Sequence, residues 1–191
     1  MRPPERETLG AAGFRRVLGQ FPTGVTVLTV RHGPTVHGMT ANAVMSVSLE
    51  PLLIACAIDR RARMLALLES ERRFAVNILA SGQEHLARRF AGTAVEDPAR
   101  PIRFWPTGPD APPVLVGALA AVRCAVDRIV EAGDHMLVLG EVSELFGSPG
   151  REEPLAFFRG RYRRLRSVPA GAEGPAEEIL PDGLRLHYDE W

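Results

Sequence analysis

Residues 36–51 read VHGMTANAVMSVSLEP, and this stretch constrains the fold and the function more than any other. From Gly38 to Leu49 it carries no charge, and most of its side chains are small. A strand that only packs a core alternates bulky and polar residues, whereas Gly38, Ala41 and Ala43 leave the backbone open to close approach. A flat heterocycle with a hydrogen-bonding edge suits such a surface. A Ser/Thr-rich strand and turn without a ligand is the alternative.

The sequence on either side of this stretch predicts mainly strands. Apolar and β-branched runs predict a hairpin over 24–44 and strands over 52–58, 74–79, 118–130 and 135–146. Three short helices are expected: one carrying Phe14, Val17, Leu18 and Phe21, one after a capping Asp59, and one from a Ser81/Glu84 capping box to about Ala91. Six prolines between Pro98 and Pro113 predict an irregular loop. Because strands follow strands, the pattern favours a mainly antiparallel β-barrel over a doubly wound α/β sheet.

The length of 191 residues suits one domain, expected over 1–166, followed by a Pro-, Gly- and Glu-rich tail over 167–191. This tail is interpreted as flexible or as an arm that covers a partner. The charge balance of 23 basic and 23 acidic residues argues against a nucleic-acid-binding domain. All the basic residues are arginines, which excludes a Schiff-base or P-loop lysine.

Several other kinds of site and location are disfavoured. Cys56 and Cys124 lie in apolar runs without a second ligand at metal spacing, so buried free thiols in a reducing cytoplasm are expected rather than a zinc site. The chain lacks the dinucleotide-binding G-x-G-x-x-G turn, a catalytic serine elbow and an H-E-x-x-H helix. No apolar run approaches the length of a membrane span, and no signal-peptide core is visible.

The opening stretch resembles the signature of the short-chain NAD(P)H:flavin oxidoreductases, the flavin-reductase-like proteins of the FMN-binding split-barrel family. The resemblance continues in the family's order through FPTGVTVLT (21–29), FAVNIL (74–79), LARRFAG (86–92), AGDHMLVLGEV (132–142) and LAFFRGRYRRL (155–165). It therefore covers about residues 14–165. It implies a mainly β, antiparallel split β-barrel with a few short flanking helices.

The same resemblance implies a set of flavin-binding residues. The ring, ribityl chain and pyrimidine edge would contact Gly38, Met39, Thr40, Ala41, Asn42, Ser46, Val47 and Ser48. The flavin phosphate would lie at Ile58, Asp59, Arg60 and Arg63, although these arginines could instead only solvate a helix face. Phe90 would cover the flavin or belong to the core, and Asn77 is either a satisfied core amide or a ring contact.

The same resemblance implies roles at two further segments, and each of them has open alternatives. His135 follows a Gly-Asp turn at the barrel rim and would be the candidate catalytic residue beside the nicotinamide, orienting it rather than transferring protons; the alternative is a surface hairpin histidine. In RGRYRRLR (159–166), Arg159 and Tyr162 would contact flavin or dinucleotide phosphates, whereas a solvated basic face or an isolated nucleic-acid patch are the other interpretations.

The resemblance implies a flavin reductase that transfers a hydride from NADH, and secondarily NADPH, to FAD or FMN. The reduced flavin would leave to serve a separate oxygenase or halogenase, and the protein would be a homodimer with no nucleic-acid or membrane partner. A non-catalytic flavin-binding module and a flavin-dependent oxidoreductase acting directly on a small molecule are the alternatives.

Overall fold

The computed structural model describes residues 6–165 except 96, 109, 149 and 151. The expected tail over 167–191 lies outside the described residues, and the division at 166 stays a prediction. The helices are α1 (Ala11–Leu18), α2 (Arg63–Glu71) and α3 (Glu84–Phe90), with a 3₁₀ turn η1 (Ser81–Gln83). The strands are β1 (Thr23–Gly24), β2 (Thr26–His32), β3 (Thr35–Ala41), β4 (Val44–Leu49), β5 (Leu52–Asp59), β6 (Arg73–Ile78), β7 (Ala120–Ala132), β8 (His135–Gly147), β9 (Leu155–Phe158) and β10 (Arg161–Arg164).

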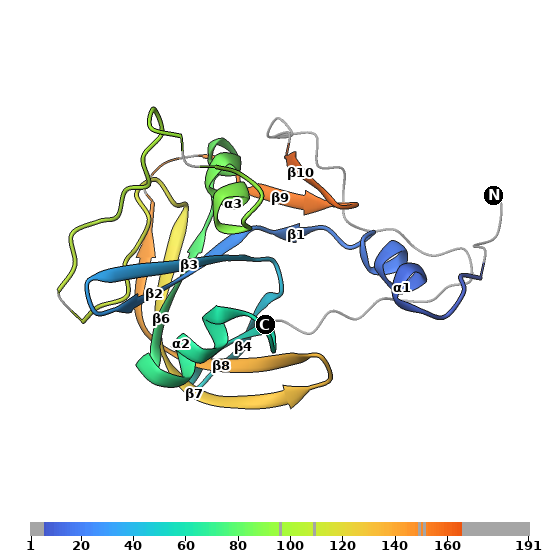
Figure 1. Ribbon diagram of the computed structural model, residues 1–191, viewed down its shortest axis with the longest axis horizontal. Helices are drawn as coiled ribbons and strands as arrows, with labels where there is room; N and C mark the ends of the chain where they lie inside the picture. Colours follow the sequence, from blue (N-terminus) through green and yellow to red (C-terminus); the bar gives the residue numbers. More distant parts are fainter. Residues whose placement is uncertain (1–5, 96, 109, 149, 151, 166–191) are drawn as a thin grey trace, which may run out of the picture.

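Seven of these strands form one antiparallel sheet in the order β3-β2-β6-β7-β8-β5-β4. β1, β9 and β10 form a second, small antiparallel sheet. Figure 1 shows the large sheet curling around α2, with α3 on the other side of β3. The mainly β, antiparallel class with short flanking helices is confirmed. β3 and β4 are the two outer strands of the large sheet, although they are neighbours in sequence.

Two hydrophobic clusters hold the layers together, and β2 contributes to both. Leu28 and Val30 pack with the buried face of α2, whereas Val25 and Val27 pack beneath α3 and the small sheet. Because successive side chains of a strand point to opposite faces, the apolar run VTVLTV buries both faces of β2. The same run therefore explains why β2 lies inside the sheet and β3 at its edge.

The predicted hairpin over 24–44 agrees with the β2–β3 pairing, and two predicted caps do not agree with the structure. The strands expected over 118–130 and 135–146 form as β7 and β8, which pair through a turn at Gly133–Asp134. The Asp59 cap was wrong, because α2 begins at Arg63 without a side-chain cap. The Ser81/Glu84 box was also wrong: the Gln83 Oε1 accepts the Ala80 N–H at 3.1 Å instead.

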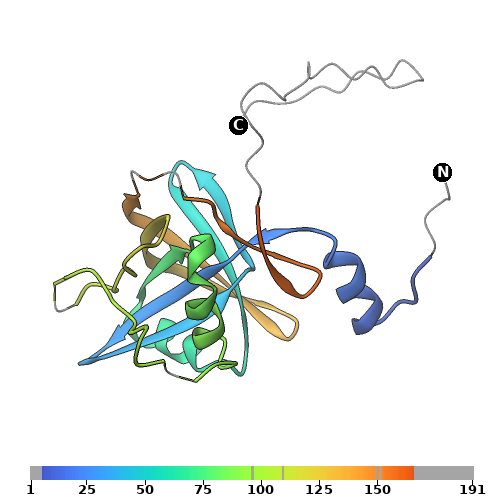
Figure 2. The same cartoon turned by 90° about the horizontal axis from the view of Figure 1, so that it is seen from above.

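Helix α1 forms where its spacing predicts, but its apolar residues do not join the core. Phe14, Val17 and Leu18 are exposed by 65%, 51% and 49%, and Phe21, just beyond the helix, by 70%. Figure 2 shows the helix standing away from the sheets. Arg159 fixes its end: the Arg159 N–H donates to the Gly19 carbonyl at 3.0 Å, and its Nε donates to Gln20 at 2.8 Å.

Candidate flavin and nicotinamide site

The side chains of β3 alternate between two packed surfaces, so its predicted ligand residues divide into two groups. Met39 and Ala41 pack toward the core beside α2. Gly38 and Thr40 face α3, where the Thr40 hydroxyl donates to the Ala87 carbonyl at 2.7 Å. Since the Thr40 hydroxyl already has this acceptor, β3 offers a ligand chiefly the main-chain groups of its outer edge.

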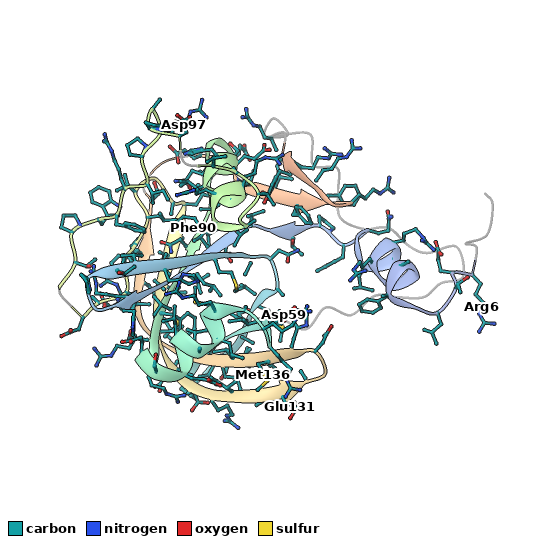
Figure 3. All side chains as sticks on the ribbon, viewed as in Figure 1. Arg6, Asp59, Phe90, Asp97, Glu131 and Met136 are labelled. Atoms are coloured by element: carbon teal, nitrogen blue, oxygen red, sulfur yellow. The ribbon has the colours of Figure 1, made fainter. Side chains whose placement is uncertain are left out.

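The close approach to Gly38 that the sequence indicated is made by a side chain of the protein. A Cβ added at Gly38 would lie 2.3 Å from Cε1 of Phe90, so the aromatic ring rests on the glycine backbone. Phe90 ends α3 and also packs against the cluster beneath that helix. Figure 3 labels Phe90 on the side of β3 where α3 lies. The ring therefore covers one face of β3 at the predicted flavin surface.

The turn after β3 leads into an exposed, mixed polar and apolar strand. Asn42 and Ser46 are exposed, and Val47 is 46% exposed where the β4–β5 register shifts between Ser46 and Ser48. The Ser48 hydroxyl accepts the Glu50 N–H at 3.2 Å. Asn42 and Ser46 are thus the side chains of this group with polar atoms open to a ligand.

The end of β5 places charged residues close to the turn that follows β3. The Ala43 carbonyl accepts the Ala57 N–H at 3.0 Å, which ties the turn after β3 to the segment that ends in Asp59. Ile58 is only 1% exposed, so its side chain belongs to the core and only its main chain could meet a ligand; its predicted contact with the flavin phosphate stays a prediction. Asp59 bonds Arg61 through both the main-chain N–H at 2.8 Å and the guanidinium, which holds the pKa of the Asp59 carboxyl well below its usual range.

The start of α2 has the chemistry of an anion site. Ala62 is the N-cap residue, no side chain among the described residues caps the helix, and no acidic residue occupies its first turn. The first N–H groups of a helix are favourable to anions, and Arg63 adds a positive charge there. Partial burial lowers the pKa of His37 on β3, and the charge of the neighbouring Arg63 lowers it further. The structure therefore brings the β3 motif and this helix start together.

His135 lies at the rim of the same end, as the sequence predicted. It is the first residue of β8 and pairs with Asp59 across the β5–β8 ladder. Its Nδ1 lies 2.7 Å from the Asp134 Oδ1, and this hydrogen bond lowers the pKa of the Asp134 carboxyl. Because a carboxylate only accepts, Nδ1 donates this hydrogen bond, and Nε2 is the ring nitrogen left to face a ligand.

Asp134 is a further candidate site residue, which the sequence indicates only as part of the Gly-Asp turn. Its position next to a candidate histidine is the signal that points to it. With 93% of its side chain exposed, it orients the ring without desolvating it.

Three other predicted residues have partners within the protein. The Arg60 guanidinium donates to Glu131 and Gly133 of the β7–β8 hairpin. Arg159 binds the end of α1, as described above. Tyr162 packs edge-on to Phe157, with the Arg88 guanidinium 5.1 Å from its ring centroid. Nothing in these contacts places the three side chains on the outer edge of β3.

Asn77 is a satisfied core amide, which is one of the two predicted alternatives. It is fully buried, its Nδ2 donates to the Val27 carbonyl at 2.9 Å, and its Oδ1 accepts the Leu115 N–H at 2.8 Å. The Asn77 side chain therefore links β2 and β6 to the irregular segment that precedes β7. A cavity of about 630 Å³ beside that loop, lined by residues that include Trp105 and Phe146, contains none of the predicted site residues.

The residues at this end of the sheet fit a flat group that carries an anion. The outer edge of β3 offers main-chain donors and acceptors, Asn42 and Ser46 offer short polar side chains, and the uncapped start of α2 suits a phosphate. No helix in the described part of the chain is long and apolar enough to cross a membrane.

Comparisons with known proteins show the family of the chain. The family model of the flavin reductase like domain matches residues 18–166. An NADH-dependent FAD reductase of Streptomyces globisporus is 42% identical over 171 residues, covering 85% of this chain and 89% of that protein. The reductase component of a 4-hydroxyphenylacetate 3-monooxygenase of Thermus thermophilus is 40% identical over 153 residues, covering 80% and 95%.

Solved structures give the same result. The flavin reductase PheA2 superposes with a TM-score of 0.76 at 42% identity, covering 83% of this chain and all of that one. BorF, the flavin reductase component of a bacterial two-component tryptophan halogenase, gives 0.72 at 35% identity, covering 83% and 100%. With a family model that spans most of its length and relatives at this identity, the chain belongs to the flavin reductase like domain family.

Proposed function

We propose that the protein is an NADH-dependent flavin reductase that releases reduced FAD or FMN to a separate oxygenase or halogenase. The observation that supports this most is the convergence of the β3 edge, the start of α2 and His135 at one end of the sheet, within the matched region. Relatives named as reductase components of a monooxygenase and of a halogenase support the partner class. The nicotinamide and flavin supply the redox chemistry, and the protein supplies their relative placement.

The candidate residues have separate roles in this proposal. The edge of β3, Asn42 and Ser46 would bind the flavin ring, and Arg63 with the first turn of α2 would hold its phosphate. His135, held by Asp134, would accept a hydrogen bond from the nicotinamide carboxamide at Nε2 and so orient the ring for hydride transfer. The side chain then contributes binding and orientation, since hydride transfer needs no proton at that nitrogen.

The test is NADH oxidation with flavin in large excess over protein, followed at the nicotinamide absorbance band. Sustained loss of NADH supports the reductase. Flavin binding without NADH loss would instead identify a binding module. Oxidation of a single equivalent, resuming only on addition of an organic substrate, would identify an oxidoreductase that acts directly. Replacing FAD by FMN, and NADH by NADPH, then ranks the substrates by kcat/KM.

The role of His135 has its own test. His135→Ala is expected to raise the KM for NADH by roughly tenfold, the effect of losing one oriented hydrogen bond of about 1.5 kcal/mol, while flavin affinity is unchanged. An unchanged KM and kcat would remove His135 from the site.

We also infer that the protein is a homodimer in the cytoplasm. Apolar side chains are exposed on α1 and, on β4, at Met45 (59%) and Leu49 (70%), and exposed apolar patches of this kind mark protein interfaces. The buried free thiols of Cys56 and Cys124 suit a reducing compartment. Sedimentation should give twice the chain mass, with Phe14→Ser weakening association and Val95→Ser, on an exposed loop, leaving it unchanged. A monomer at all concentrations would contradict the dimer.

A further inference from the structure

Arg60 makes three hydrogen bonds to the β7–β8 hairpin, and none of them involves a ligand. Its main-chain N–H donates to the Asp134 carbonyl at 3.2 Å. Its Nη1 donates to the Gly133 carbonyl at 3.2 Å and to the Glu131 carboxylate at 2.5 Å. Arg60 therefore contacts Glu131 near the end of β7 and both residues of the turn, Gly133 and Asp134.

This turn is the element that carries His135. The chain leaves β7 at Ala132, passes through Gly133 with a left-handed φ of 65°, and starts β8 at His135. Residues 131–134 are all exposed, so apolar packing does little to fix the tip of the hairpin. Figure 3 shows Glu131 and Asp59 labelled in the same region, on the hairpin and at the end of β5. Hydrogen bonds from the β5–α2 segment thus supply the constraint that packing lacks.

The three arginines of this segment are engaged differently. The Arg61 side chain bonds the Asp59 carboxylate and the Arg60 side chain bonds the hairpin, whereas the Arg63 guanidinium makes no hydrogen bond to any residue that the structure describes. A guanidinium already bonded to a carboxylate and a carbonyl has less capacity to bind a phosphate than Arg63 has. The sequence-based role of Arg60 as a phosphate ligand is therefore the weaker alternative.

We propose that Arg60 is a positioning residue that latches the β7–β8 hairpin and thereby holds His135 at the nicotinamide position. This inference rests on the proposed function for its catalytic consequence, but the latch itself is a property of the free protein. The two interpretations of Arg60 predict different effects of its loss. If Arg60 positions the hairpin, its loss weakens the binding of NADH; if Arg60 is a phosphate ligand, its loss weakens the binding of the flavin phosphate.

The first experiment is amide hydrogen exchange of the protein without substrates. Arg60→Ala is expected to speed exchange in the 131–136 segment by about fivefold, the loss of roughly one net hydrogen bond of stabilisation. Arg128→Ala is the matched control, because Arg128 is an exposed arginine on β7 whose guanidinium bonds only the adjacent Asp127 among the described residues. Unchanged exchange in Arg60→Ala would overturn the latch whether or not the protein reduces flavins.

The second experiment separates the two roles kinetically. For a latch, Arg60→Ala raises the KM for NADH by about threefold to tenfold, and the ratio of FMN to riboflavin affinity stays at the wild-type value. Glu131→Gln shows a smaller effect in the same direction, and the double variant is no worse than Arg60→Ala because both changes break one contact. A fall in the FMN to riboflavin ratio with an unchanged KM for NADH would identify Arg60 as a phosphate ligand and overturn the proposal.

Discussion

The ring of Phe90 rests on the backbone of Gly38, so that the last residue of α3 occupies the space a side chain on β3 would need. The distance from an added Cβ to the Phe90 Cε1 would be 2.3 Å, and to Cδ1 2.4 Å. The Thr40 hydroxyl, two residues along the same face, bonds the Ala87 carbonyl of α3. Together these contacts set the position of α3 against the edge strand of the candidate site.

Gly38→Ala is therefore expected to destabilise the protein by about 1–3 kcal/mol, because the new methyl group overpacks the Phe90 contact. Urea denaturation measures the change in the free energy of unfolding. Gly82→Ala is the control, since a Cβ at Gly82 meets nothing within 4 Å. Equal stability of Gly38→Ala and the wild type would show that Phe90 moves aside without cost.

Replacing the Asn77 amide should remove the link between the sheet and the loop. Asn77→Ala leaves the Val27 carbonyl and the Leu115 N–H without this partner in a buried place, and a loss of about 2–4 kcal/mol is expected. Denaturant unfolding measures it, with Ser143→Ala as an exposed-hydroxyl control expected to change stability by less than about 0.5 kcal/mol. A small effect at Asn77 would mean that the loop finds other partners.

The stability of the fold should fall on mild acidification, in part because of His37. Partial burial and the nearby Arg63 charge lower the pKa of His37 below its usual 6.5, so the unfolded chain binds a proton more readily than the folded one. This contribution is fully present above pH 6.5 and is lost as the pH falls from there toward the folded pKa.

His37→Gln, which cannot be protonated, should therefore lose less stability than the wild type between about pH 7.5 and pH 5. The comparison of the two proteins by urea denaturation cancels the titration of the other histidines. Asp59 and Asp134 lie outside this range, because their pKa values are lowered from 3.8. Parallel pH profiles would contradict the assignment to His37.

The two cysteines should be inert in the native protein. Burial raises the pKa of both Cys56 and Cys124 to about 12, so at pH 8 only about one thiol in ten thousand is ionised. A thiol-specific chromogenic reagent is expected to label neither residue before unfolding and both after it. Rapid labelling of the folded protein would show that the core opens on the timescale of the reaction.

The motifs predict the family, and the succession of strands predicts the antiparallel class. The sequence pattern does not predict the short strands β9 and β10. A two-residue turn joins them, and Arg159 and Gly160 both have left-handed φ values of 51° and 74° there. Arginine is not a typical residue at such a position, so the local turn signal was weak. Only the pairing of Thr23 and Gly24 with β9 shows that the segment closes a second sheet.

The sequence alone determined that this is a mainly β flavin-reductase-like chain, and it predicted residues 36–51 and His135 as its candidate site. Such features depend on residue order and local periodicity, which are visible in one dimension. The tertiary structure decided that the Phe90 ring rests on Gly38, that the Ile58 side chain belongs to the core, and that Arg60 bonds the hairpin next to His135. Those outcomes depend on contacts between residues that are far apart in the chain. The sequence does not show which partner a given arginine or glycine meets in the folded protein.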